Sequence, residues 1–256
     1  MINLTKSSNP VLKENVFSRD YRSSAEVMTI NGTMNKTALM LLIVIAAAIF
    51  TWNKFFEAVT TNPETASAAV MPWVIVGGIG GLIAALVTAF RPKSAGISAP
   101  IYAVFEGLLL GGLSAVFESM YGGIVMRAVL LTLAVFFAML FLYRSGIIKV
   151  TEKLKMGIFA ATAGIAVVYL VSFIGSFFGM QMSFLYGNSN LSIGISLFIV
   201  AIAALNLVLD FSFIEEAAGA GAPKYMEWYG AFGLMVTLIW LYLEILRLLS
   251  KLASRD

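Results

Sequence analysis

Residues 156–209, MGIFAATAGIAVVYLVSFIGSFFGMQMSFLYGNSNLSIGISLFIVAIAALNLVL, contain no charged side chain. A transmembrane helix needs about 20 apolar residues to cross roughly 30 Å of hydrocarbon, so these 54 residues are too many for one helix. Glycine and asparagine residues between positions 179 and 190 interrupt the stretch and favour a turn. We therefore predict two membrane-spanning helices, over residues 156–178 and 191–214.

The whole chain has a similar composition. Of its 256 residues, 60% are hydrophobic and 12% are charged, whereas soluble domains have about 45–50% apolar and about 25% charged residues. This difference excludes a soluble globular fold. The chain has no Cys, which excludes disulfides and thiolate sites, and no His, the commonest general base and metal ligand. We expect neither enzymatic activity, nor a cofactor, nor nucleic acid binding.

Five further apolar stretches predict an all-α, polytopic transmembrane bundle of seven spans. The spans cover residues 38–56, 70–90, 97–117, 122–143, 156–178, 191–214 and 226–249. Residues 1–36 are polar and lack the apolar region of a signal peptide, so we expect a flexible N-terminal tail. The transmembrane domain is then residues 37–250, followed by a basic C-terminal tail, residues 251–256.

The Lys and Arg residues near the ends of the spans predict the orientation. With the N-terminus inside, ten of them lie on the inner side of the membrane and five on the outer side. This favours a cytoplasmic N-terminus. Three of the five exceptions, Arg247, Lys251 and Arg255, are at the C-terminal end. A re-entrant segment among the last two spans is the alternative, and it would place both termini inside.

Four glycines are candidates for helix packing. Gly77 and Gly81 lie four residues apart, as do Gly107 and Gly111, so each pair shares one helix face. Small residues at this spacing allow helix backbones to approach closely in a membrane. The alternative is that these glycines are flexible points that line a pathway.

Two carboxylates lie inside predicted spans. Glu106 is near the middle of residues 97–117, and Asp210 follows 19 uncharged residues. An ionisable group at the bilayer centre costs at least about 2.5–3.5 kcal/mol and usually faces the protein interior. We interpret both as titrating or cation-coordinating groups that could bind Ca²⁺ weakly. The alternatives are a neutral, hydrogen-bonded Glu106 and a wet, interfacial Asp210.

Glu244 is a third acid, in the last span. At 1.5 Å per residue it lies roughly 25–30 Å along its helix from the loop that Asp210 adjoins, so the two acids should not pair. Arg247 follows three residues later, a spacing at which helical side chains meet. We therefore predict an interfacial ion pair between Glu244 and Arg247.

Three short motifs resemble those of the Bax inhibitor-1/YccA-like family of seven-helix membrane proteins. They are FEGLLLG at 105–111, LDFSFIE at 209–215 and RLL at 247–249. The second motif departs from the family's Asp-Thr-Gln pattern at Phe211 and Ser212. The resemblance covers roughly residues 37–250.

This resemblance implies a bundle with the last helix central, and a pH-sensitive calcium leak controlled by two aspartates in the last two helices. Asp210 matches the first aspartate. Alignment on residues 247–249 places Thr237 at the second position, whereas alignment on residues 241–244 places Glu244 there. Thr237 is favoured, because Glu244 should lie too far along its helix to pair with Asp210.

The leading hypothesis is a calcium leak in a bacterial inner membrane, with Asp210 and Glu106 lining a low-affinity path and Thr237 as a further ion-pathway or pH-sensing candidate. Its partners are then the lipid bilayer and Ca²⁺ or protons. The alternative is a membrane interaction protein without transport activity. It would modulate a membrane protease or another membrane complex through residues 1–36 and the glycine-rich faces.

Overall fold

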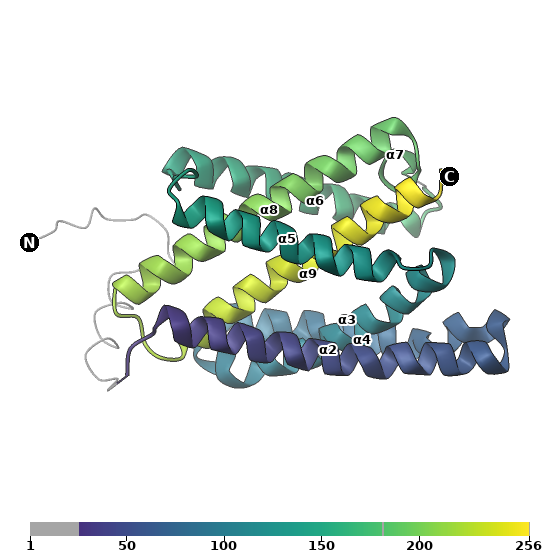
Figure 1. Ribbon diagram of the computed structural model, residues 1–256, viewed down its shortest axis with the longest axis horizontal. Helices are drawn as coiled ribbons and strands as arrows, with labels where there is room; N and C mark the ends of the chain where they lie inside the picture. The colour runs from purple at the N-terminus through teal and green to yellow at the C-terminus, as the bar shows by residue number, and fades with distance from the viewer. Residues whose placement is uncertain (1–25, 181, 256) are drawn as a thin grey trace, which may run out of the picture.

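The computed structural model describes residues 26–180 and 182–255, and the long elements in that part of the chain are helices (Figure 1). Seven of these helices are long and apolar enough to cross a membrane. This confirms the predicted all-α bundle. The helices are α2 (Ile30–Thr61), α3 (Ala66–Phe90), α4 (Ala95–Met120), α5 (Ile124–Arg144), α6 (Glu152–Ser176), the short α7 (Ser183–Tyr186), α8 (Asn190–Gly219) and α9 (Met226–Ala253).

The first long helix begins earlier than its apolar stretch. Thr29 caps α2, because its hydroxyl accepts a hydrogen bond of 2.9 Å from the amide of Gly32. Such a cap satisfies an amide that has no partner within the helix. Residues 30–36 are therefore helical, although their polar composition predicts a flexible tail. Residues 1–25 of that predicted tail lie outside the described residues.

The last two long helices also extend beyond their predicted spans. α8 continues past residue 214 to Gly219, and α9 continues through Ala253. Each is one continuous helix, so neither contains a re-entrant break. Gly221, with a φ of 70°, makes the turn between them. Lys251 therefore belongs to α9 and is buried, instead of lying in a basic tail.

The last helix is central, as the resemblance implied. α9 contacts α2, α3, α4, α5 and α8, and it is the most buried of the seven long helices. Figure 1 shows it running obliquely between α2 and α5. One side of α9 packs with α5 and α8 around Leu238 and Leu241, and the other packs with α2 and α4 around Phe232 and Met235.

Three of the four glycines singled out in the sequence, Gly77, Gly107 and Gly111, lie where helix backbones approach closely, whereas Gly81 faces the side chain of Glu106. A Cβ atom added to Gly107 would lie 2.5 Å from the carbonyl oxygen of Val44 in α2, and one added to Gly77 would lie 2.6 Å from that of Phe105 in α4. These distances are too short for any side chain. Gly107 and Gly111 therefore permit α2 to pack closely on α4, and Gly77 permits α3 to do so.

Gly111 provides a stability test of this packing. A Cβ at this position would lie 2.2 Å from the carbonyl oxygen of Ala48, so Gly111→Ala must push α2 and α4 apart. We expect the free energy of unfolding to fall by about 1–3 kcal/mol, measured by thermal unfolding in detergent.

Gly164 is the matched control, because a Cβ there meets nothing within 4 Å. Gly164→Ala should raise the stability by about 0.5–1 kcal/mol, since alanine is the better helix former. Equal effects of the two substitutions would contradict the close packing at Gly111.

Candidate functional site

Three polar residues of α9 share one helix face. Thr237, Glu244 and Lys251 recur at intervals of seven residues, which is nearly two turns at 3.6 residues per turn. All three are buried, with Thr237 the most exposed at 8%. Polar side chains buried along one face of a membrane helix must find partners on a neighbouring helix.

The neighbouring helix is α8. Asp210 lies beside Thr237, whose hydroxyl donates to Gly233 O one turn earlier at 3.3 Å, and the hydroxyl of Ser196 accepts a hydrogen bond of 2.7 Å from Lys251 Nζ. Along this interface the residue numbers of α8 decrease as those of α9 increase, so the two helices are antiparallel. We call this interface the polar seam, and its members are Ser192, Ser196, Asp210, Thr237, Glu244, Arg247 and Lys251.

Asp210 has a buried oxygen with a vacant hydrogen-bonding position. Its Oδ2 atom is buried and has no hydrogen-bond partner among the described residues. Gly233 lies on the facing helix, where even an added Cβ would remain 3.9 Å from Asp210 Oδ1. A carboxylate oxygen with no partner inside a helical bundle is costly. This oxygen is therefore available to a cation or a proton donor.

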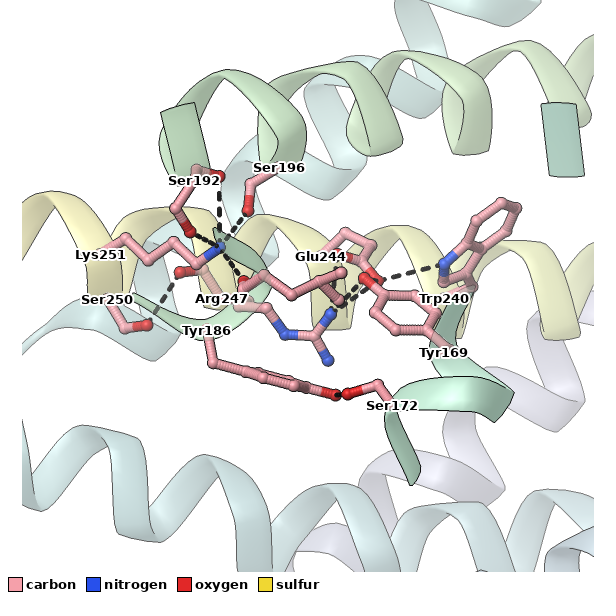
Figure 2. Close-up of polar contacts among 11 residues, drawn as sticks. Tyr169, Ser172, Tyr186, Ser192, Ser196, Trp240, Glu244, Arg247, Ser250 and Lys251 are labelled. Carbon is pink, nitrogen blue, oxygen red and sulfur yellow. Dashed lines mark hydrogen bonds and ion pairs between the residues drawn. The ribbon is translucent and has the colours of Figure 1, made fainter. Parts of the chain in front are cut away.

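Glu244 is the acid of a buried cluster in the polar seam (Figure 2). Its Oε1 atom accepts hydrogen bonds from Tyr169 Oη at 2.8 Å, from Trp240 Nε1 at 3.3 Å and from Arg247 Nη1 at 3.0 Å. The Arg247 guanidinium also lies over the Tyr169 ring, 5.1 Å from its centroid. The structure thus contains the ion pair with Arg247, and it places the acid, which is only 2% exposed, inside the bundle.

Lys251 is a buried cation, although the sequence predicts it in a basic C-terminal tail. It lies two turns beyond Glu244 and is 5% exposed. Figure 2 shows its side chain extending from α9 to Ser192 and Ser196 in α8. The seven-residue spacing of Thr237, Glu244 and Lys251 could have indicated that Lys251 is buried, because a continuous helix through residue 251 places all three on one face.

Glu106 lies outside the polar seam. It lies beside Tyr102 on its own helix and faces Gly81 of α3, where an added Cβ would lie 3.0 Å from Glu106 Oε1. Tyr102 in turn packs edge-on against Phe232, with ring centroids 5.0 Å apart. Phe232 belongs to the side of α9 that faces α2 and α4. No described contact joins Glu106 to the polar seam.

A further acid, Glu227, ties the start of α2 to the start of α9. It is fully buried and accepts hydrogen bonds from Thr29 N at 2.9 Å and Thr29 Oγ1 at 3.0 Å. It also pairs with Lys36 and, at 3.3 Å, with Lys224. All of its oxygens are satisfied, so this cluster fastens the two helices together and offers no vacant ligand position.

The described residues contain no group of three or more Asp, Glu, His or Cys residues that could hold a metal ion. Asp210 and Glu106 are thus two separate single carboxylates, one in the polar seam and one between α3 and α4.

Comparison with curated proteins and with solved structures gives no match. A family comparison does: the sequence pattern of the family described as Bax inhibitor 1 like matches residues 9–254. The match covers nearly the whole chain and includes all seven of the long apolar helices. The chain therefore belongs to the Bax inhibitor 1 like family of membrane proteins.

Proposed function

We propose that this protein is a low-affinity calcium leak in which Asp210, within the polar seam, is the carboxylate that meets the ion. The observation that carries the proposal is the buried and unpartnered Oδ2 atom of Asp210. Ionisable residues inside membrane spans commonly mark ion pathways. Ca²⁺ is bound by carboxylate, hydroxyl and carbonyl oxygens, and Thr237 supplies a hydroxyl beside Asp210.

The Asp210 carboxylate and the Thr237 hydroxyl together support only weak binding of Ca²⁺. One carboxylate and one hydroxyl are far fewer than the six to eight oxygens that a tight calcium site uses. A conduction site must also release its ion, so weak binding favours flux. Glu106 faces the other side of α9 through Tyr102 and Phe232, so this proposal assigns it no part in the same site.

We place the protein in a bacterial inner membrane as a multi-pass protein with a cytoplasmic N-terminus. The charge distribution supports this orientation more strongly once the fold is considered. Lys251 is buried, and Arg247 pairs with buried Glu244, so neither is a charge flanking the membrane. Without these two, the Lys and Arg distribution is ten inside to three outside.

The alternative role, as a modulator of a membrane protease or another complex, relied on residues 1–36 and on the glycine-rich faces. Those faces are covered by helices of the same chain: Gly107 and Gly111 by α2, and Gly77 by α4. A partner would have to use other surfaces, and no described contact favours one. The leak is therefore the function that we propose.

Calcium entry into proteoliposomes that contain a fluorescent calcium indicator tests the proposal. Wild-type protein should admit Ca²⁺ faster than protein-free liposomes, with half-saturation at about 10⁻³ M or weaker. Thr237→Val keeps the side-chain shape but removes the hydroxyl beside Asp210. We expect the flux of this variant to fall by about 2–10-fold, the equivalent of one hydrogen bond.

Thr132→Val is the matched control. Thr132 is also buried, and its hydroxyl donates to Ala128 O of its own helix at 2.7 Å, as the Thr237 hydroxyl donates to Gly233 O at 3.3 Å, but Thr132 lies outside the polar seam. Its flux should equal that of the wild type. Wild-type flux no greater than that of empty liposomes would contradict the leak. Equal flux from the two valine variants would exclude the Thr237 hydroxyl from the path.

A further inference from the structure

The ammonium group of Lys251 lies within a shell of oxygen atoms. Its Nζ atom is 2.6 Å from Leu185 O, 2.7 Å from Ser196 Oγ, 2.8 Å from Ser192 Oγ and 3.3 Å from Ser192 O. The shell therefore combines two hydroxyls with two backbone carbonyls. A lysine ammonium has three N–H groups, so four surrounding oxygens resemble the coordination shell of an ion more than a set of single hydrogen bonds.

The chemistry of this shell selects for a single positive charge. None of the four oxygens belongs to a carboxylate, and the nearest acid of the polar seam, Glu244, is already bound by Arg247. Divalent cations such as Ca²⁺ and Mg²⁺ are held in proteins largely by carboxylates. Neutral carbonyl oxygens, in contrast, replace the hydration shell of monovalent K⁺ in channel filters.

The shell and the ammonium that it surrounds come from three separate elements. Leu185 belongs to α7, Ser192 and Ser196 belong to the first turns of α8, and Lys251 belongs to the last turn of α9. Ser192 and Lys251 are both buried, at 0% and 5% exposure. A buried ammonium without a paired acid is stable only where such dipoles replace its water.

We propose that these four oxygens form a binding site for a monovalent alkali cation, and that in the wild-type protein the ammonium of Lys251 permanently occupies it. The side chain then acts as a tethered cation that joins α7, α8 and α9 at one end of the polar seam. This proposal does not depend on the calcium leak, because it concerns binding at a different set of atoms.

Truncation of the lysine should expose the site to free ions. Lys251→Ala removes the ammonium and leaves space beside the four oxygens, whereas Lys251→Met fills the space with an apolar chain of similar length. Purified variants are compared by thermal unfolding in detergent at constant ionic strength. The salts are KCl, NaCl and the chloride of N-methyl-D-glucamine, whose cation is too large for the site.

We expect KCl or NaCl to raise the unfolding temperature of the alanine variant by about 2–4 °C relative to N-methyl-D-glucamine chloride, in a saturable manner. The wild type and the methionine variant should show no saturable shift. Ser196→Ala in the alanine background removes one of the four oxygens and should weaken the response to the cation. Lys54→Ala, at a half-exposed surface lysine, controls for loss of a positive charge.

The difference between KCl and NaCl identifies which cation fits better. An alanine variant that unfolds at the same temperature in all three salts would overturn the proposal. So would an alanine variant that fails to fold in both KCl and NaCl, because the proposal requires a free cation to substitute for the ammonium. An equal cation response from the methionine variant would also overturn it, since that variant has no space for an ion.

Discussion

Glu244→Ala is expected to lower the free energy of unfolding by about 3 kcal/mol, which corresponds to a fall of roughly 6–12 °C in unfolding temperature. The substitution leaves the Arg247 guanidinium, the Tyr169 hydroxyl and the Trp240 indole N–H without their shared acceptor. Breaking a buried ion pair on one side costs about 3–5 kcal/mol. The lower end of this range applies because the Arg247 side chain remains 31% exposed.

Two further variants distinguish the effect of burial on stability from the effect of charge. Glu57→Ala breaks the ion pair with Lys54 on the surface of α2, where both side chains are about half-exposed or more, and it should cost at most about 1 kcal/mol. Glu244→Gln keeps an acceptor oxygen and the side-chain shape, so its effect should lie between those of the two alanine variants. A Glu244→Ala protein as stable as Glu57→Ala would show that Glu244 is not part of a buried cluster.

The seven helices could be predicted from the sequence because each one carries about 20 apolar residues. The ends of the helices were harder to predict. α2 begins among polar residues because Thr29 caps it, and α8 retains Glu215 and Glu216 beyond its apolar part. Hydropathy reports where a helix contacts lipid, whereas the hydrogen-bonded helix continues as far as its caps permit.

The register of α8 against α9 was only partly accessible from the sequence. Two alignments placed either Thr237 or Glu244 opposite Asp210, and the structure places Thr237 there. Glu244 lies two turns away, bound by Arg247 and by Tyr169 of α6. The partner from α6 could not be inferred, because neither periodicity nor spacing reports which helices are neighbours.

The placement of Glu106 and Asp210 in one ion path was an interpretation from their depth in the membrane alone. Depth does not determine which side of a central helix each residue faces. Glu106 packs toward α3 and, through Tyr102, toward Phe232 on α9, while Asp210 lies beside Thr237 on another face. The rotation of each helix about its axis depends on tertiary packing that one sequence does not reveal.

The central claim is that Asp210 is the carboxylate of the proposed calcium path. A substitution at Asp210 is therefore expected to have the largest effect on function. Asp210→Asn removes the charge but keeps the shape of the side chain, so the fold should persist. An amide carries no net charge to attract Ca²⁺. We therefore expect calcium flux to fall by at least about tenfold, the equivalent of 1.4 kcal/mol in barrier height.

Glu106→Gln is the matched variant, because it neutralises the second carboxylate inside the bundle by the same chemical change. Its side chain lies beside Tyr102 and faces α3, outside the polar seam. We expect its calcium flux to remain within about twofold of the wild type, a difference well below 1 kcal/mol. Thermal unfolding of both variants establishes that they are folded.

The most direct measurement is the calcium flux of Asp210→Asn and Glu106→Gln, reconstituted at equal protein density in the same lipid. We predict that the Asp210 variant loses its flux and that the Glu106 variant keeps it. Wild-type flux from Asp210→Asn, or an equal loss from both variants, would contradict a calcium path through the polar seam at Asp210.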